Sequence, residues 1–253
     1  MTPKTLIIIP CFNEELRLDT CAFINFLKNY KHISFLFVND GSTDKTEILL
    51  KNLAEKQKDN IQILNLSRNS GKAEAVRQGF LKGFSLCPDF IGYLDADLAA
   101  PLECIPDLEH VIYNRNKDIV IGSRIALLGW KIKRNNFRHY AGRVFATAVS
   151  MALGLRVYDT QCGAKLFRVT ERLKVIFSTP FVTKWIFDVE ILARFQFTET
   201  TSSQNLNSIC FESPLEQWID KKGSKLNLMD FIHSAIDLIK LMNIIRRKSL
   251  PRL

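Results

Sequence analysis

The chain has 253 residues, of which 47% are hydrophobic and 24% charged, a composition that excludes global disorder and collagen-like repeats. The formal net charge of +9 is uneven: residues through Val120 carry 14 Lys or Arg and 16 Asp or Glu, whereas the rest carry 21 and 10. The second half therefore favours an anionic partner, such as a phosphate or an anionic membrane. Few aromatic residues are interleaved with this charge, so no nucleic-acid partner is expected.

Six cysteines and four histidines are scattered along the chain without a CxxC pair. This pattern favours reduced thiols in a cytoplasmic protein and argues against a zinc site. The longest uncharged stretch near helical composition covers 144–155, whereas a membrane-spanning helix needs about 20 apolar residues. The sequence therefore predicts a cytoplasmic location, with any membrane contact being peripheral and at the cytoplasmic face.

Short apolar runs alternate with segments of helical spacing over the first 120 residues. The apolar runs, which are typical of buried parallel strands, are 6–9, 35–38, 61–64, 90–94 and 119–121. The segments with helical spacing between them are 16–27, 43–53, 73–84 and 102–112. This alternation predicts an α/β fold with a mostly parallel central sheet flanked by helices.

The last part of the chain, 226–247, has the pattern of an amphipathic helix. Its polar stripe is Asp230, His233, Asp237 and Lys240, at steps of three and four residues, and a basic tail follows. Such a helix suits the interface of an anionic membrane. Packing of the same helix on the rest of the protein, or on a second subunit, is the alternative.

Polar loops follow the first, second and fourth apolar runs, and ligands bind beyond the carboxyl ends of strands in open α/β sheets. Asp95 and Asp97, one residue apart at a strand end, predict a site for Mg²⁺ or Mn²⁺ against a diphosphate. The alternative for this Asp95-Ala96-Asp97 segment is a solvated turn.

Asp40 and Lys72 also follow predicted strands, and each has two interpretations. The segment 39–44 can cap the next helix, or Asp40 can contact the ribose or base of a nucleotide. Lys72 can meet a phosphate at a helix N-terminus, or it can be an exposed lysine in a first turn. Neither a GxGxxG nor a GxxxxGK[ST] pattern is present, which argues against a Rossmann dinucleotide loop and a P-loop.

Taken together, the motifs at 10–15, 38–44, 95–97 and 122–124 resemble family 2 glycosyltransferases, which have the GT-A fold. The segments 159–167, 185–190 and 223–226 are similar to the branch that transfers glucose to dolichyl phosphate. The resemblance implies a GT-A domain over 1–225, with a nucleotide-sugar half, 1–122, and an acceptor half, 123–225. The helix and basic tail, 226–253, would form an appendage.

The resemblance also implies roles for individual residues. The nucleoside pocket would be lined by Pro10, Phe12, Glu14, Val38 and Asp40. Asp95 and Ala96 would contact the nucleotide, Asp97 would hold the metal, and Arg124 and Lys225 would contact donor phosphate or sugar. Two positions depart from related mannosyltransferases: Ala99 stands in place of a metal-shell glutamine, and Ile219 in place of an arginine.

The expected activity is inverting transfer of a hexose, preferably glucose from UDP-glucose, to a polyprenyl (dolichyl-type) phosphate. Alternatives are transfer to a hydroxyl of a glycan or glycolipid, and a non-catalytic module that binds nucleotide sugars. The basic stretch after residue 123, which holds Arg124, Arg134 and Arg138, would hold the acceptor phosphate unless it is a solvated helix face.

Asp188 and Glu190 are the candidates for a catalytic base or for orienting the acceptor. The alternative for both residues is helix capping, or pairing with Lys184 and Arg194.

Overall fold

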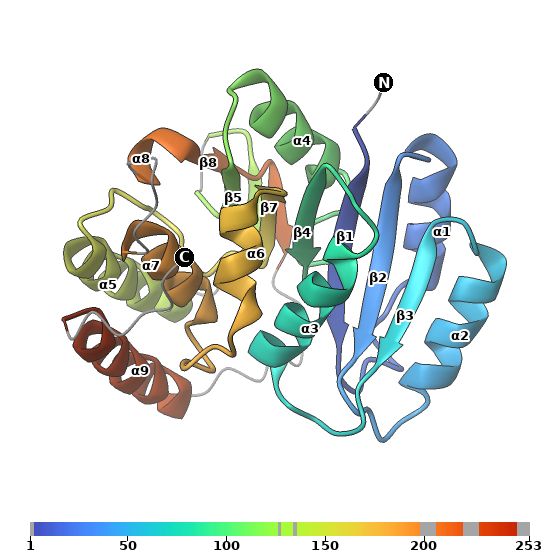
Figure 1. The fold of residues 1–253 in the computed structure, drawn as a ribbon, viewed down its shortest axis with the longest axis horizontal. Helices are drawn as coiled ribbons and strands as arrows, with labels where there is room; N and C mark the ends of the chain where they lie inside the picture. Colours follow the sequence, from blue (N-terminus) through green and yellow to red (C-terminus); the bar gives the residue numbers. More distant parts are fainter. Residues whose placement is uncertain (1–2, 126–127, 134–135, 198–205, 220–227, 247–253) are drawn as a thin grey trace.

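The computed structural model describes residues 3–125, 128–133, 136–197, 206–219 and 228–246, and a sheet of seven strands forms its centre (Figure 1). The strands of this sheet are β1 (Thr5–Cys11), β2 (Ile33–Asn39), β3 (Ile61–Asn65), β4 (Phe90–Leu94), β5 (Ile119–Ser123), β7 (Ala164–Arg168) and β8 (Cys210–Pro214). They lie in the order β3-β2-β1-β4-β7-β5-β8, and β7 runs antiparallel to its neighbours β4 and β5. A smaller sheet pairs β6 (Lys131–Lys133) with β9 (Gln217–Ile219).

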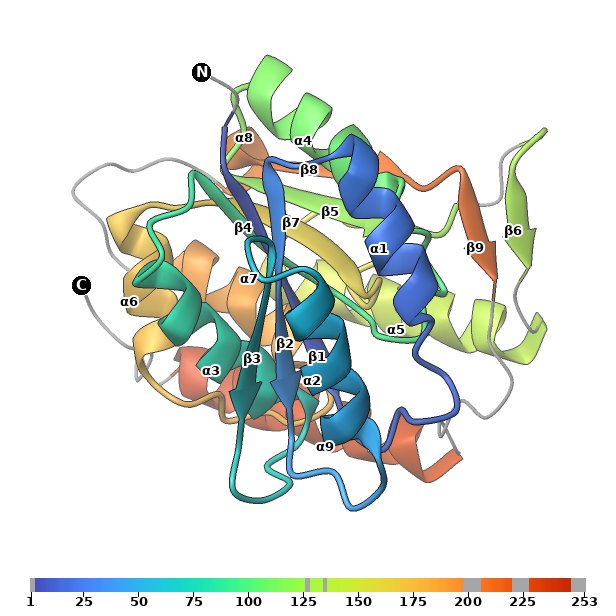
Figure 2. The ribbon, with the colours of Figure 1, turned by 90° about the vertical axis from the view of Figure 1, so that its right-hand side faces the viewer.

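Helices cover both faces of the large sheet, as Figure 2 shows for α1 on one side and for α3 and α6 on the other. The helices are α1 (Thr20–Asn29), α2 (Thr46–Lys56), α3 (Lys72–Phe84), α4 (Cys104–Asn114), α5 (Asn136–Leu153), α6 (Glu171–Ser178), α7 (Phe187–Phe197), α8 (Leu206–Ile209) and α9 (Leu228–Arg246). Leu6 and Ile8 of β1 belong to the core under α3, α6 and α7. Ile7 and Ile9 belong to the core under α1, α2 and α4, because successive side chains of a strand point to opposite faces.

The predicted α/β architecture is confirmed, and each predicted strand is present. The helices differ from the prediction mainly at their starts. Helix α1 begins at Thr20 instead of residue 16, because the side chain of Asp19 accepts a hydrogen bond from Ala22 N and so caps the helix there.

Strand β7 comes from the second half of the chain but lies between β4 and β5 of the first half. The two halves expected on either side of residue 122 therefore share one sheet, and the division into a nucleotide-sugar half and an acceptor half stays a prediction. This insertion brings the 159–168 segment beside the end of β4.

Helix α9 lies within the range 226–247 predicted for an amphipathic helix, but the predicted polar stripe does not face solvent throughout. Asp237 is buried, and its Oδ2 accepts hydrogen bonds from Lys184 N at 3.2 Å and Trp185 N at 3.4 Å. Leu241 is buried in the core, whereas Ile236 and Ile239 are exposed. The helix thus packs on the domain through an aspartate and turns isoleucines outward. No helix within the described ranges is long and apolar enough to cross a bilayer.

Replacing Phe80 with alanine should lower the free energy of unfolding by about 3–5 kcal/mol, the usual cost of removing a buried phenylalanine. Phe80 is fully buried on α3, and its ring stacks on Phe177 of α6 with 3.9 Å between centroids. Urea unfolding measures the change. Tyr113→Ala on α4, where the side chain is 66% exposed, is the control and should change stability by less than about 1 kcal/mol. Equal losses of unfolding free energy in the two variants would contradict the placement of Phe80 in the core.

Candidate active site

The loops that follow β1, β2 and β4 gather at one edge of the sheet, because these strands are parallel neighbours. In Figure 1 this is the lower edge, toward which the arrowheads of β1 to β4 point. The start of α3 and the start of the antiparallel strand β7 lie at the same edge. The acidic loops predicted to meet there are therefore brought together.

Asp40 directly follows β2 and is buried at this edge. Its Oδ1 accepts from Ser70 N and its Oδ2 from Gly71 N, both at 2.8 Å. Burial raises the pKa of Asp40, and these two backbone donors oppose the rise. The neighbouring Gly41 has φ +64°, which favours glycine. Its backbone also approaches that of Arg68 so closely that a Cβ atom at Gly41 would lie 2.5 Å from the carbonyl carbon of Arg68. Asp40 therefore ties the end of β2 to the loop that begins α3.

Asp95 and Asp97 form a turn immediately after β4. Asp95 N donates to Gly163 O at 3.1 Å, and Asp97 Oδ1 accepts from Ala99 N at 3.0 Å. The carboxylate of Asp95 forms an ion pair with Lys72 at the N-terminus of α3. Burial, followed by the nearby charge of Asp95, raises the pKa of Asp97. Desolvation lowers the pKa of Lys72, but the charges of Asp95, Asp188 and Asp97 outweigh it and raise that pKa.

The residues at this turn fit a divalent cation. Two carboxylates that repel each other at a strand end are hard oxygen ligands, which suit Mg²⁺ and Mn²⁺. Within the described ranges, no group of three or more Asp, Glu, His or Cys side chains could hold a metal. A cation here would therefore take its remaining ligands from water or from a donor diphosphate, as is usual for Mg²⁺.

Arg124 follows β5, and it has an acidic partner that sequence analysis did not assign. Its Nε and Nη2 donate to the two carboxylate oxygens of Asp159 at 2.6 and 2.7 Å. The guanidinium also lies over the ring of Trp218, 4.8 Å from the centroid. The stretch from 124 to 158 holds no acid, but Asp159 comes next in the chain. Arg124 is therefore half-buried in an ion pair with a buried aspartate, and its removal would take the arginine partner from the buried carboxylate of Asp159.

Asp188 lies in the first turn of α7 and is buried beside the end of β4. Its Oδ1 accepts hydrogen bonds from the Tyr93 hydroxyl and, at 2.5 Å, from Lys165 Nζ. Neither partner was singled out for a role in the sequence. A lysine inside the apolar run of β7 was the available signal, because a lysine in a buried strand requires an anionic partner.

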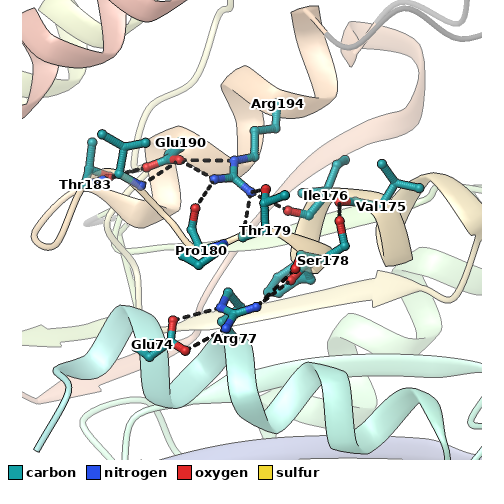
Figure 3. A network of polar contacts seen from close by, with 12 residues as sticks. Glu74, Arg77, Val175, Ile176, Ser178, Thr179, Pro180, Thr183, Glu190 and Arg194 are labelled. Atoms are coloured by element: carbon teal, nitrogen blue, oxygen red, sulfur yellow. Dashed lines mark hydrogen bonds and ion pairs between the residues drawn. The ribbon is translucent and has the colours of Figure 1, made fainter. Parts of the chain in front are cut away.

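Glu190 has no exposed surface, and its contacts are structural (Figure 3). Its carboxylate accepts from Thr183 N and Oγ1 at 2.8 Å, and it pairs with Arg194 at 2.7 Å. Pairing with Arg194, the alternative left open by the sequence, is thus what the structure shows. Arg194 in turn donates to carbonyl oxygens of Ile176, Thr179 and Pro180.

Arg77 of α3 reaches the same segment from the other side (Figure 3). It pairs with Glu74 and donates to the carbonyl oxygens of Phe177 and Ser178 at 3.3 Å. These contacts fix the segment between α6 and α7, and Asp188 is the second residue of α7, directly after that segment. Glu190 is therefore part of a buried structural network, while a contact of Asp188 with substrate stays a prediction.

The remaining predicted residues are placed as follows. Val38 and Ala96 are buried in the two cores, Glu14 is buried and pairs with Arg17, and Pro10 and Phe12 are half-buried at the end of β1. Their contact with a nucleoside stays a prediction. Arg134, Lys225 and the side chain of Arg138 lie outside the described residues.

The mostly parallel sheet with helices on both faces has the GT-A fold, which solved glycosyltransferase structures share. Among solved structures, glucosyl-3-phosphoglycerate synthase of Mycobacterium tuberculosis, crystallised with Mn²⁺, UDP and glucosyl-3-phosphoglycerate, aligns with a TM-score of 0.66 at 16% identity, over 99% of this chain and 81% of that one. This likeness establishes the fold alone.

The chain belongs to glycosyl transferase family 2, whose model matches residues 6–169. It is 34% identical to dolichyl-phosphate beta-glucosyltransferase ALG5A of Trichomonas vaginalis, over 93% of this chain and 72% of the relative. It is also 34% identical to the dolichyl-phosphate beta-glucosyltransferase of Saccharomyces cerevisiae, over 92% and 72%. The Dictyostelium discoideum protein of the same name is 32% identical.

Replacing Gly163 with alanine should weaken metal-dependent binding of a nucleoside diphosphate such as UDP. A Cβ at this position would overlap the carboxylate of Asp95 and force it to move. We expect the factor by which Mn²⁺ increases UDP affinity to be about tenfold smaller in the variant than in the wild type, a difference of about 1.4 kcal/mol in binding free energy. Calorimetric titration with and without Mn²⁺ measures this, and affinity without metal is the internal control. A Mn²⁺ effect equal to that of the wild type would contradict the prediction.

Proposed function

We propose that this protein transfers a glucosyl residue from UDP-glucose to the phosphate of a dolichyl or other polyprenyl lipid. The observation that carries the proposal is 30–34% identity, over about nine-tenths of the chain, to proteins named dolichyl-phosphate beta-glucosyltransferase. The turn after β4 that carries Asp95 and Asp97, with Lys72 beside it, supports a reaction in which a nucleoside diphosphate is the leaving group. A single displacement would invert the anomeric centre and give a β-linked product from an α-linked donor.

The donor side of this reaction needs charge neutralisation on the departing diphosphate. A divalent cation held by Asp97 and Asp95 would supply most of it, and the Mn²⁺ in the M. tuberculosis structure supports that choice. Lys72 pairs with Asp95 at this turn, and the positive end of α3 adds to its effect. Asp40 holds the α3 loop in place for the nucleoside.

The acceptor side needs cations more than a base, because a phosphate monoester is already largely ionised near neutral pH. Arg124 is held by Asp159 and by the face of Trp218, so it is oriented before an acceptor arrives. Arg134, Arg138 and Lys225 remain proposed partners of phosphate. Asp188 would orient the transferred sugar or the acceptor at the same edge.

The lipid acceptor implies a peripheral contact with a membrane, and α9 is the proposed surface. Its described outer face presents Ile236 and Ile239, with Lys240 nearby and paired to Asp237. An apolar face with a lysine beside it suits the headgroup boundary of an anionic bilayer. The loop that α9 packs against leads directly to Asp188, so this surface is connected to the site.

The transfer itself is tested with purified protein, labelled UDP-glucose, polyprenyl phosphate and Mn²⁺. Label should enter the lipid phase, and Asp97→Ala should reduce the rate by about a hundredfold or more, since it removes a group that stabilises developing charge. Asp89→Ala, at the opposite end of β4, is the matched control and should retain activity. Full activity of Asp97→Ala, or of the wild type in chelator, would refute the metal role. No lipid label with any nucleotide sugar would refute the proposed reaction.

Membrane contact is tested by sedimentation with vesicles that contain anionic phospholipid. Ile239→Glu should reduce binding, because it places a charge on the proposed apolar face. Ile48→Glu on α2 is the matched control: Ile48 is 59% exposed and Ile239 is 63% exposed. Binding should also fall as salt rises, since the Debye length shrinks from about 10 Å at 0.1 M to about 3 Å at 1 M. Equal sedimentation of the two variants would exclude α9 as the contact.

A further inference from the structure

Lys165 is a charged residue in the interior of the central sheet. It lies on β7, in register with Tyr93 of β4 on one side and Ile121 of β5 on the other. Its neighbours Ala164, Leu166 and Phe167 are buried, and Lys165 itself is only 2% exposed. Taking an ammonium group out of water costs several kcal/mol, so a lysine at this position needs a specific partner.

That partner is Asp188. Lys165 Nζ donates to Asp188 Oδ1 at 2.5 Å and to the carbonyl oxygen of Cys162 at 2.7 Å. The hydroxyl of Tyr93 donates to the same oxygen of Asp188. Burial and the Asp188 carboxylate raise the pKa of Tyr93 well above its usual value, so the phenol keeps its proton and acts as a donor. Two neighbouring strands therefore hold one oxygen of Asp188.

The other oxygen, Oδ2, receives no hydrogen bond from the described part of the chain, and Asp188 keeps a small exposed area. Asp188 lies close enough to Lys72 for its charge to act on that lysine together with those of Asp95 and Asp97. Lys72 also lies 6.0 Å from the ring centroid of Phe187, the residue before Asp188. Asp188 is thus at the border of the donor site, with one oxygen fixed and one available.

Stability alone does not account for this arrangement. Replacing a buried ion pair with apolar residues of similar volume is often neutral or stabilising. A buried Lys–Asp pair at the edge of a site therefore points to a requirement for a fixed carboxylate. The exposed pair of Lys174 with Glu171 on α6, at 2.6 Å, carries no such cost.

We propose that Lys165 is a positioning residue: its ammonium group fixes Oδ1 of Asp188 against the sheet and thereby presents Oδ2 to the bound nucleotide sugar. This inference rests on the proposed function, because it assumes that the site binds a nucleotide sugar. Lys165 itself does not contact substrate and acts through Asp188.

The test is a double-mutant cycle of Lys165→Met, Asp188→Asn and the two combined, with Lys174→Met as the control. Steady-state kinetics of lipid glucosylation give kcat and the KM for UDP-glucose, and UDP-glucose hydrolysis without acceptor gives a second rate. We expect Lys165→Met to lower kcat at least tenfold with KM within about twofold of wild type. Adding it to Asp188→Asn should change either rate less than twofold, because the two residues act as one unit. Lys174→Met should leave both rates unchanged.

Lys165→Met alone leaves a buried carboxylate without its cation and can lose stability, so thermal unfolding of all variants is measured in parallel. The combined variant removes both charges and should unfold near the wild-type temperature. If Lys165→Met does not fold, Lys165→Gln replaces it in the cycle, since it keeps a hydrogen-bond donor without the charge. Wild-type kcat in the folded single variant, or reductions that multiply in the combined variant, would overturn the assignment. Absence of lipid product in the wild type would refute the proposed acceptor, while the hydrolysis cycle would still test Lys165.

Discussion

Negative charge at the carboxyl edge of the sheet is the constraint on which the rest of the structure depends. Asp40, Asp95, Asp97, Asp159 and Asp188 all lie at or near this edge, where low exposure strengthens their mutual repulsion. Each is neutralised or hydrogen-bonded differently. Backbone N–H groups serve Asp40, whereas a lysine or arginine from another element serves Asp95, Asp159 and Asp188. Carboxylates held by such partners are fixed in place, whereas those with fewer partners remain available to a ligand.

Asp97 is the carboxylate of this group with the least compensation from the described residues. Its pKa is raised by burial and by Asp95, and Ala99 N is its hydrogen-bond donor. Asp95, by contrast, holds Lys72. A divalent cation would relieve the repulsion at this turn and would leave Lys72 free for phosphate, so donor, metal and lysine are expected to be coupled.

The segment between α6 and α7 depends on support from buried arginines. Arg77 and Arg194 donate to carbonyl oxygens at the end of α6 and beyond it, and Glu190 ties Arg194 to Thr183 (Figure 3). Because these donors satisfy buried backbone acceptors, the segment between α6 and α7 can be irregular and still fixed. Helix α9 adds to this through Asp237, which accepts from backbone N–H groups at residues 184 and 185. The surface proposed to meet the membrane and the carboxylate at the site are therefore joined through one short segment.

The sequence by itself determined the strands β1 to β5, the helices α1 to α4 and the turn that carries Asp95 and Asp97, because hydrophobic periodicity and strand-end position are local properties. The sequence also sets the order of the motifs along the chain, and that order was sufficient to recognise the family. It could not choose between Asp188 and Glu190, two residues apart on one helix, since that choice depends on which partner each one meets. The tertiary structure sets these partners: inserting β7 between β4 and β5 places Lys165 against Asp188, while Arg194 pairs with Glu190. The tertiary structure likewise determines the pairing of Arg124 with Asp159 and the burial of Asp237. These contacts join residues far apart in the chain, and no local sequence pattern indicates the partner.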